Sequence, residues 1–199
     1  MSEFDARARE WDKDKMHTDR SAAIAAELEK MIPLDTSMKA LEYGAGTGIL
    51  SFLLKDRFAE ITLMDNSTEM IKVCAEKIGY HKTDHILPIC FDLEHKDYDG
   101  HFDIIYNQMV LHHVNDYESI IGTFYSMLNP EGYLAIADLY TEDGSFHGAD
   151  VQVHLGFDPE SLAEILKHIG LKHIEYKSCF EVTRESGLKY PVFLLVAQK

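Results

Sequence analysis

Short runs of apolar residues alternate along the chain with segments in which apolar residues recur every three or four positions. The short runs predict strands, and the longer spacing predicts amphipathic helices. Regular alternation of the two is typical of a mostly parallel sheet that helices cover on both faces, which places the chain in the α/β class. The predicted strands are residues 38–43, 60–65, 84–90, 102–107, 132–139, 171–181 and 190–198.

Four stripes of apolar residues at helical spacing separate these strands, and we expect each stripe to face the core. They are Leu50, Leu53, Leu54 and Phe58; Met70, Cys74 and Ile78; Ile120, Phe124, Met127 and Leu128; and Leu162, Ile165, Leu166 and Ile169. Only about ten residues, 181–190, separate the last two predicted strands. That is too short for a crossover helix, so these strands are predicted to form an antiparallel hairpin.

The N-terminal part of the chain predicts a helix that ends before Pro33, preceded by a more polar stretch containing Trp11. We expect residues 1–35 to form a helical cap or lid and residues 36–199 to form a cofactor-binding α/β core. A chain of 199 residues suits a single domain with a sizeable core, so both parts are expected to belong to one domain, 1–199.

The segment after the first predicted strand carries the most specific chemical signal. Gly44 allows a sharp turn, and Gly46 and Gly48 lack the Cβ atoms that would keep a ligand away from the backbone. Asp65 ends the next strand 21 positions beyond Gly44, where its carboxylate can accept hydrogen bonds from two ribose hydroxyls. Together these residues predict a nucleoside-type cofactor.

The spacing of the glycines separates the candidate cofactors. A dinucleotide site uses Gly-x-Gly-x-x-Gly to hold a pyrophosphate at a helix N-terminus, but here Ile49 stands where the last glycine is needed. Glu42, at the end of the preceding strand, would repel a phosphate and attract a cationic amino-acid group. A nucleoside joined to an amino acid fits this pattern better than NAD does.

These motifs resemble the class I S-adenosylmethionine-dependent methyltransferases, and within them the small-molecule enzymes of the ubiquinone and menaquinone methyltransferase type. The resemblance is strong over residues 36–140. It implies a Rossmann-like, seven-stranded, mostly parallel sheet with an antiparallel last strand, helices on both faces, and S-adenosylmethionine as the cofactor that is converted to S-adenosylhomocysteine. The matching segments are Glu42-Tyr-Gly-Ala-Gly-Thr-Gly48, Asp65, Phe91-Asp-Leu93, Phe102-Asp-Ile-Ile-Tyr-Asn107 and Leu128-Asn-Pro-Glu-Gly-Tyr-Leu134.

The resemblance also implies which groups meet the cofactor. Glu42 and the backbone around Gly44 and Asn107 would face the methionine ammonium and carboxylate, Asp65 the ribose, and Asp92 the adenine amino group. Trp11 would close over the cofactor or simply anchor its helix. The implied cofactor residues are Trp11, Glu42, Gly44, Ala45, Gly46, Thr47, Gly48, Asp65, Asn66, Asp92, Leu93 and Asn107. Relatives often carry an apolar residue at the position of Asn66, so the amide predicts a modestly weaker affinity.

Methyl transfer depends on orientation and exclusion of water rather than on a protein nucleophile. An acceptor that must lose a proton needs a general base, and histidine suits that role near neutral pH. His112 and His113 follow the fourth strand, and His147 and His154 follow the fifth. His154, in a His-x-Gly-Phe pattern similar to one in relatives, is our first candidate base and His113 the second, although either could be a packing or capping residue.

Residues 140–156 interrupt the α/β pattern with glycines, polar residues and aromatics. Long connections at the carboxyl ends of strands commonly hold substrate, although this one could also be a solvated loop. We expect this segment and the N-terminal helices to form the pocket that selects a small-molecule methyl acceptor by shape. The acceptor atom, whether O, N or C, stays open.

Composition narrows the possible partners. The chain carries 34 acidic and 19 basic residues, a charge of −15 that disfavours nucleic acid. Its three widely spaced cysteines suit free thiols in a reducing cytoplasm, and no segment has the length of a membrane span or the form of a signal peptide. Without a Cys-x-x-Cys pair or paired acids, no metal site is predicted. Oligomeric state is left open.

Two alternatives stay open at this point. The chain could bind S-adenosylmethionine without turnover, as an inactive or scaffolding protein, or it could be an NAD-dependent dehydrogenase. The identity of the bound ligand separates the dehydrogenase from the other two. Turnover alone separates the methyltransferase from the inactive protein, because a fold does not fix a function.

Overall fold

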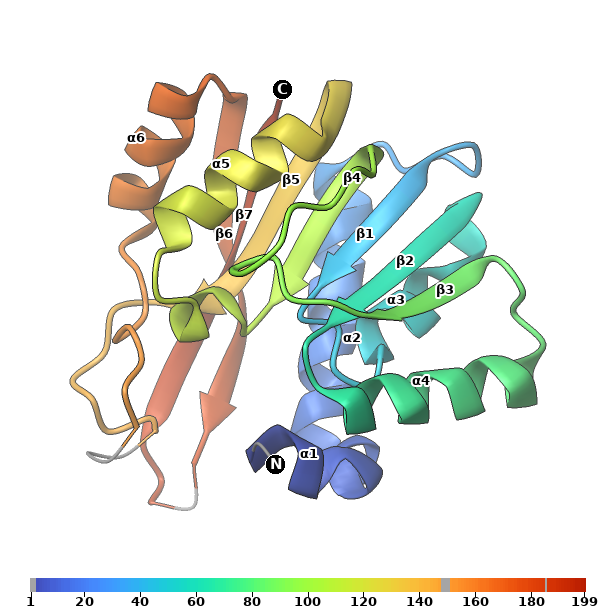
Figure 1. Ribbon diagram of the computed structural model, residues 1–199. Coiled ribbons are helices and arrows are strands. Elements are labelled where there is room, and N and C mark those ends of the chain that lie inside the picture. The colour runs from blue at the N-terminus through green and yellow to red at the C-terminus, as the bar shows by residue number, and fades with distance from the viewer. Residues whose placement is uncertain (1–2, 148–150, 185) are drawn as a thin grey trace.

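The computed structural model describes residues 3–147, 151–184 and 186–199, and in this part of the chain seven strands form one sheet (Figure 1). The order is β3-β2-β1-β4-β5-β7-β6, in which β1 to β5 pair in parallel and β7 runs antiparallel to both neighbours. The expected sheet with its reversed last strand is therefore confirmed. The strands are β1 Lys39–Tyr43, β2 Glu60–Asp65, β3 Ile86–Cys90, β4 Phe102–Gln108, β5 Leu128–Leu139, β6 Lys172–Thr183 and β7 Lys189–Gln198.

Helices cover both faces of the sheet. In Figure 1, α5 and α6 lie in front of it and α2 and α3 lie behind it, while α4 packs along β2 and β3. The helices are α1 Glu3–Arg7, η1 Ala8–Lys13, α2 Lys15–Met31, α3 Ile49–Leu54, η2 Lys55–Arg57, α4 Thr68–His81, η3 Leu111–His113, α5 Tyr117–Met127 and α6 Pro159–Ile169. The Asp14 side chain caps α2 by accepting a hydrogen bond from the Met16 amide, and the helix ends before Pro33 as expected.

The two larger layers of the core lie one on each face of the sheet, and a third, smaller cluster includes Phe146, Val182 and Tyr190. Successive strand residues point to opposite faces, so Ile105 of β4 packs in the layer of Phe124 from α5, and Ile104 packs in the layer of Ile24 from α2. Most of the predicted apolar stripes lie in these two layers. Leu53 is an exception, since its side chain is 51% exposed.

The exposure of Leu53 has a geometric cause. Helix α3 buries Leu50, Ser51 and Leu54, and the Ser51 hydroxyl donates to Glu42, so its inner face is turned toward Ser51 and Leu53 points outward. A second correction concerns β5, which begins at Leu128 rather than at residue 132. Phe102 pairs with Leu128 but Ile104 pairs with Tyr133, so the register shifts between these two pairs. Residues 129–132, which the sequence suggested would precede the strand, are therefore part of β5.

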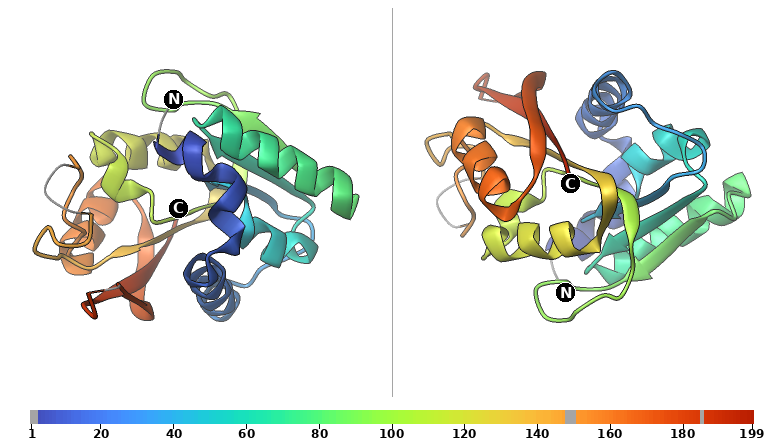
Figure 2. Two further views of the ribbon diagram at one scale, coloured as in Figure 1. Left: turned by 90° about the horizontal axis from the view of Figure 1, so that it is seen from below. Right: turned by 90° about the horizontal axis from the view of Figure 1, so that it is seen from above.

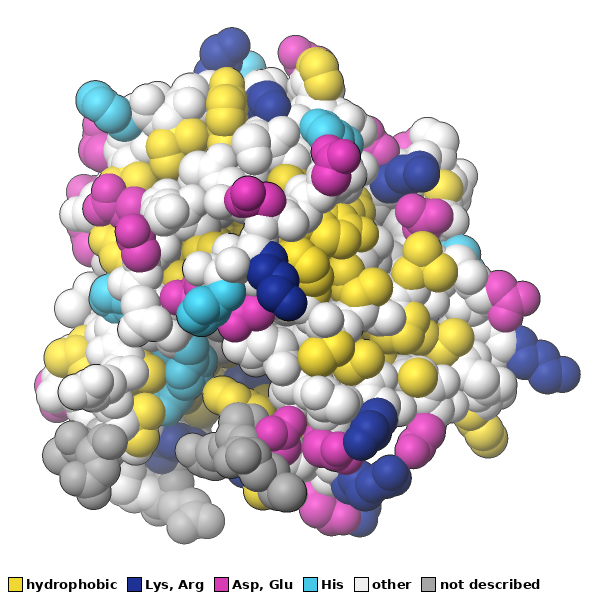
Figure 3. Space-filling model, in the orientation of Figure 1, with side chains coloured by type: hydrophobic (Ala, Val, Ile, Leu, Met, Phe, Trp, Pro, Cys, Tyr) yellow, Lys and Arg dark blue, Asp and Glu magenta, His cyan; other side chains and the backbone are white. Residues whose placement is uncertain are grey.

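The N-terminal segment crosses the edge at which the parallel strands end. Figure 2 shows α1 and η1 lying across this edge when the molecule is seen from below. In the space-filling view the surface is hollowed beneath the centre, and histidine side chains lie along one wall of the hollow (Figure 3). Among the described residues, no helix is long and apolar enough to cross a membrane.

Candidate functional site

A cavity of about 370 Å³ lies at the carboxyl ends of the parallel strands. Its walls come from the N-terminal segment, the glycine loop, the ends of β2 and β4, the start of the loop after β3, and the segment after β5. The cavity therefore lies where the sequence predicted a cofactor. The predicted site residues that line it are Trp11, Gly44, Ala45, Gly46, Asp65, Asn66, Asp92 and His113.

The glycine loop has the backbone that the sequence predicted, with φ of +64° at Gly44 and +56° at Gly46. A Cβ on Gly44 would lie 2.4 Å from Cγ2 of Val110, so this glycine lets the loop pack tightly against the chain after β4. A Cβ on Gly46 would find Trp11 Nε1 at 3.9 Å as its nearest neighbour. The loop therefore leaves space beside Gly46, where a ligand can approach the backbone.

Asp65 lies at the wall of the cavity beside this loop. Its Oδ2 accepts a hydrogen bond from the Gly46 amide at 2.7 Å, and its Oδ1 accepts one from the Ser67 amide at 2.8 Å. Burial raises the pKa of the Asp65 carboxyl, although both amides favour its ionised form. These bonds fix the carboxylate in place, and its remaining lone pairs can accept ribose hydroxyls.

Asp92 lies farther along the same wall. Its Oδ1 accepts a hydrogen bond from the Glu94 amide at 2.9 Å, which orients the carboxylate at the turn after β3. The next residue, Leu93, is buried and packs in the core instead of lining the cavity. Its expected contact with the cofactor stays a prediction, as does the bond between Asp92 and adenine.

Glu42 is buried beneath the glycine loop and does not line the cavity. Its Oε2 accepts hydrogen bonds from the Ser51 amide at 3.2 Å and from the Ser51 hydroxyl at 2.5 Å. Burial raises the pKa of the Glu42 carboxyl to about 7. Its Oε1 and both polar side-chain atoms of Asn107 are buried without hydrogen-bond partners. Such orphaned atoms at the ends of β1 and β4 could be satisfied by a polar ligand group. Neither residue lines the cavity, so the expected role of Glu42 toward methionine stays a prediction.

Thr47 and Gly48 hold the loop rather than line the cavity. Gly48, with φ of +77°, is the residue before α3, and a Cβ there would lie 2.9 Å from Cδ1 of Leu63. The Thr47 hydroxyl donates a hydrogen bond to Asp12. Lys77 donates to Oδ2 of Asp12 at 2.7 Å and to the Thr47 carbonyl at 2.9 Å. The N-terminal segment is thereby tied to the loop that it covers.

Trp11 lies at the cavity wall, and its ring stacks on that of His17 with centroids 4.0 Å apart. This position suits either of the roles expected from the sequence, a lid over a cofactor or an anchor for the N-terminal helices. Phe4 approaches from the same segment and contacts the edge of His113, with ring centroids 5.3 Å apart. The N-terminal residues thus form one side of the cavity.

The two histidines proposed as bases lie in different places. His113 lines the cavity, and burial lowers the pKa of its imidazole to about 3. His154 lines a smaller hollow of about 180 Å³ and is absent from the wall of the larger cavity. Its Nε2 is 3.0 Å from the Val114 carbonyl oxygen and 3.3 Å from that of Asn115, to which it can donate. The geometry favours His113 over His154, and a catalytic role for either stays a prediction.

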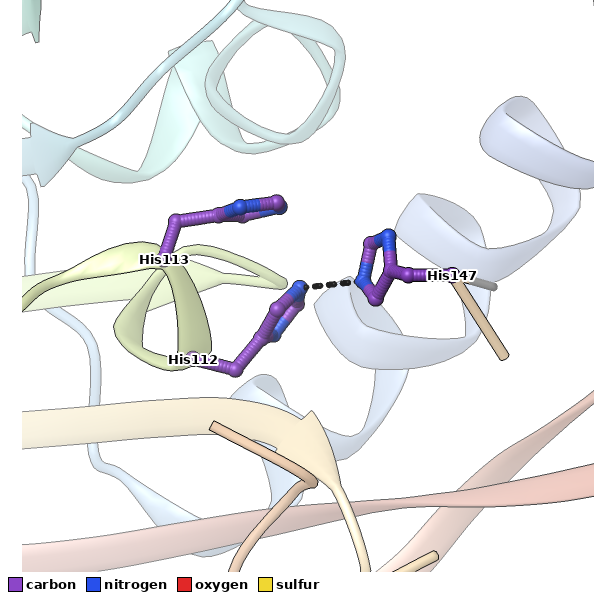
Figure 4. Close-up of side chains that lie close together, drawn as sticks. All are labelled: His112, His113 and His147. Atoms are coloured by element: carbon purple, nitrogen blue, oxygen red, sulfur yellow. Dashed lines mark hydrogen bonds between the residues drawn. The ribbon is translucent and has the colours of Figure 1, made fainter. Parts of the chain in front are cut away.

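His112 and His147, which the sequence analysis did not rank, meet in the cavity wall. His112 Nδ1 lies 2.6 Å from Oδ1 of Asp138, and both side chains are fully buried. The Nε2 atoms of His112 and His147 are 3.1 Å apart (Figure 4). Burial lowers the pKa of His147 to about 4. In the sequence, these side chains could be noticed only as histidines. Their pairing with Asp138 could not be predicted, because Asp138 lies 26 positions beyond His112.

Three arginines, Arg7, Arg20 and Arg184, also line the cavity, although no sequence motif singled them out. Arg20 of α2 is buried, its Nε has no hydrogen-bond partner, and burial lowers the pKa of its guanidinium to about 10. Arg184 lies over the Phe146 ring, 4.5 Å from its centroid, and donates to the Phe146 carbonyl. An arginine in an amphipathic helix looks like a solvated residue, so no pattern in the sequence singled out Arg20.

The comparisons with known proteins agree on one family, the methyltransferases. The methyltransferase domain family matches residues 16–176. An uncharacterized methyltransferase of Schizosaccharomyces pombe is 27% identical over 157 residues, which cover 70% of this chain and 55% of that protein. Trans-aconitate 2-methyltransferase of Deinococcus radiodurans is 26% identical over 141 residues, covering 69% and 52%. The chain thus spans about half the length of these two relatives.

Solved structures extend the likeness to the whole fold. A complex of DhpI with S-adenosylhomocysteine superposes with a TM-score of 0.73 at 25% identity, covering 98% of this chain and 92% of that one. The N-methyltransferase NodS of Bradyrhizobium japonicum, in complex with S-adenosylhomocysteine, gives a TM-score of 0.73 at 18% identity and covers 95% and 91%. At 18% identity this second likeness shows the fold alone.

Proposed function

The chain belongs to the family of class I S-adenosylmethionine-dependent methyltransferases, and we propose that it transfers a methyl group from this cofactor to a small-molecule acceptor. The cofactor supplies an electrophilic methyl group on a sulfonium. The observation that carries the proposal is the position of Asp65, fixed by two backbone amides beside the open face of Gly46 at the cavity wall.

The remaining cofactor contacts follow from the family pattern and the chemistry of the groups present. Asp65 would accept the ribose hydroxyls, and Asp92 would accept the adenine amino group. Glu42 and the backbone around Gly44 and Asn107 would face the ammonium and carboxylate of the methionine part; the unpartnered Oε1 of Glu42 supports this role, although neither Glu42 nor Asn107 lines the cavity itself. The bare backbone beside Gly46 would let the nucleoside lie close to the loop.

The walls of the cavity can supply most of what methyl transfer requires. The N-terminal segment, held by Asp12, would act as a lid that excludes water and keeps the acceptor in line with the methyl group. His113 lines the cavity and is a candidate base by position, but burial lowers its pKa to about 3, which makes the imidazole a weak proton acceptor near neutral pH. His154, the first candidate base from the sequence, lies outside this cavity and is kept as the alternative.

We further propose that the acceptor carries an anionic group bound by Arg20. The buried guanidinium with an unpartnered Nε lines the cavity, and a carboxylate or phosphate would satisfy it. The names of two relatives agree, since trans-aconitate and phosphoethanolamine are both anionic. The narrower likeness to ubiquinone and menaquinone methyltransferases stays a prediction.

Calorimetric titration with S-adenosylmethionine, S-adenosylhomocysteine and NADH tests the cofactor. We expect both sulfur nucleosides to bind and NADH not to bind. Asp65→Ala should weaken binding about 100-fold, since it removes charge-assisted hydrogen bonds. Asp56→Ala changes an exposed carboxylate of η2 and should leave binding unchanged. Failure of either nucleoside to bind the folded protein would contradict the proposal.

Turnover tests the activity and the acceptor. Formation of S-adenosylhomocysteine would be followed with matched anionic and neutral acceptors, including quinols, phenols, amines and carboxylates. We expect turnover with an anionic acceptor and a KM for it that Arg20→Gln raises about tenfold or more. Binding of both nucleosides without turnover of any acceptor would favour an inactive or scaffolding protein instead.

A further inference from the structure

We propose that His112, His113 and His147 bind one divalent transition-metal ion in the cavity wall. His112 and His113 lie in η3 after β4, and His147 lies in the segment after β5. Each of these three side chains offers one ring nitrogen as a ligand atom. The three nitrogens all lie within 4.8 Å of one another. Figure 4 shows the three rings gathered around a common space.

The spacing of these nitrogens approaches that of a metal site. With zinc–nitrogen bonds of about 2.0 to 2.1 Å, two ligands of a tetrahedral ion lie about 3.3 Å apart. The Nε2 atoms of His112 and His147 are 3.1 Å apart. The nitrogen of His113 lies within the same 4.8 Å limit, so small rotations of the rings would complete the set.

The carboxylate of Asp138 supports this assignment independently. Its Oδ1 lies 2.6 Å from His112 Nδ1, and its Oδ2 accepts the His112 backbone amide at 3.2 Å. When Nδ1 of His112 carries the proton and donates a hydrogen bond to the carboxylate, Nε2 has a free lone pair directed at His147. Metal-binding histidines almost always have such an outer partner, which fixes the tautomer and the ring orientation.

The competing interpretation is a hydrogen-bonded histidine cluster without a metal. In that case His147 donates its Nε2 proton to His112 Nε2, and the short distance needs no ion. The two interpretations differ in what lies between the rings. The metal site predicts stoichiometric metal binding. The hydrogen-bonded cluster predicts only the weak metal binding that exposed histidines show.

Three imidazoles leave a fourth position of a tetrahedral ion open to the cavity, as in catalytic zinc sites. This consequence rests on the proposed function. An acceptor hydroxyl or carboxylate could bind at that position, and the ion would lower the pKa of a bound hydroxyl. The metal would thereby favour acceptors with an oxygen ligand.

Metal titration of the chelator-treated full chain tests the site without requiring turnover. Co²⁺ should bind at one equivalent with the visible absorption of a four-coordinate ion, and Zn²⁺ should displace it. His147→Ala and His147→Gln should each weaken Zn²⁺ binding about 100-fold, and Asp138→Asn about 10-fold or more. His168→Ala changes an exposed histidine of α6 and serves as the matched control.

The outcomes separate this inference from the proposed function. Absence of stoichiometric binding, or binding that both His147 variants leave intact, would overturn the metal site. If that protein still binds S-adenosylhomocysteine, the proposed function stands. Metal binding in a folded protein that binds no sulfur nucleoside would support the site and contradict the proposed function.

Discussion

Lys77 Nζ lies 2.7 Å from Oδ2 of Asp12 and joins η1 to α4 beside the glycine loop. Asp12 also accepts the Thr47 hydroxyl, so a single carboxylate links the N-terminal segment to two separate elements of the core. Glu76, the residue before Lys77 in α4, pairs with Arg9 at 3.0 Å, but both of those side chains are largely exposed. Ser67 Oγ also donates to Oδ1 of Asp5 at 2.6 Å, so the contacts of Asp12 are among those expected to hold the segment over the cavity.

Replacing Asp12 with alanine should open this segment. Because the segment forms one wall of the cavity, S-adenosylhomocysteine should dissociate faster and its Kd should rise about tenfold, which corresponds to about 1.4 kcal/mol. Stopped-flow release and calorimetry would measure the two effects. Glu10→Ala is the control, since Glu10 pairs only with Lys13 among the ion pairs described for this helix and both are exposed. An unchanged release rate for Asp12→Ala would argue against the lid.

Trp11 provides a direct probe of the same segment, because it is the chain's single tryptophan and lines the cavity. Its stacking on His17 should be perturbed when a nucleoside enters. We expect the tryptophan emission to change on addition of S-adenosylhomocysteine, with the same Kd as calorimetry gives. Trp11→Phe should bind the ligand without the signal. Calorimetric binding with constant emission would place the ligand away from Trp11.

The sequence predicted those features that depend on local pattern. Strand positions follow from short apolar runs, and the cofactor edge follows from the left-handed glycines and the carboxylate that ends β2. The antiparallel hairpin of β6 and β7 followed from the short connection between two apolar runs. Each of these depends on residues that are close together in the chain.

The features that the sequence missed come from long-range packing. His112 and His147 approach only because η3 and the segment after β5 meet at one edge of the sheet. Arg20 reaches the cavity because the polar side of α2 turns inward there, which its residue type does not indicate. Leu53 shows the opposite error, since an apolar residue at helical spacing is exposed because α3 buries the face that carries Ser51 instead.

Alanine at Gly46 should separate ligand binding from folding. The Cβ would project into open space near Trp11, where it would obstruct a nucleoside, and the left-handed φ of +56° would cost about 1 to 2 kcal/mol of stability. We expect a folded protein with at least a tenfold higher Kd for S-adenosylhomocysteine.

Gly122→Ala is the matched control for this change. Gly122 lies within α5, and a Cβ there meets nothing within 4 Å. Alanine should raise the free energy of unfolding by about 0.5 to 1 kcal/mol through helix propensity and leave the Kd unchanged. Equal ligand affinities of the Gly46→Ala variant and the original chain would mean that the cofactor does not approach this backbone.

Glu42 should make the stability of the ligand-free protein fall as the pH rises. Its pKa is about 7 in the folded chain, raised by burial from an ordinary 4.5, although the charge of Lys77 opposes the shift. Below about pH 4.5 the Glu42 carboxyl is protonated in both the folded and the unfolded chain, so its titration does not lower the free energy of unfolding.

Between pH 4.5 and 7 the unfolded chain releases the Glu42 proton while the folded chain keeps it, so this carboxyl lowers the free energy of unfolding by about 3 kcal/mol in total. Above pH 7 both states are ionised and the contribution becomes constant. Urea unfolding of the original chain and of Glu42→Gln between pH 5 and 8 would measure the difference. The gap between the two curves should change by about 1.4 kcal/mol per pH unit below 7 and level off above it. Parallel curves over that range would show that Glu42 is already ionised in the folded protein at pH 5.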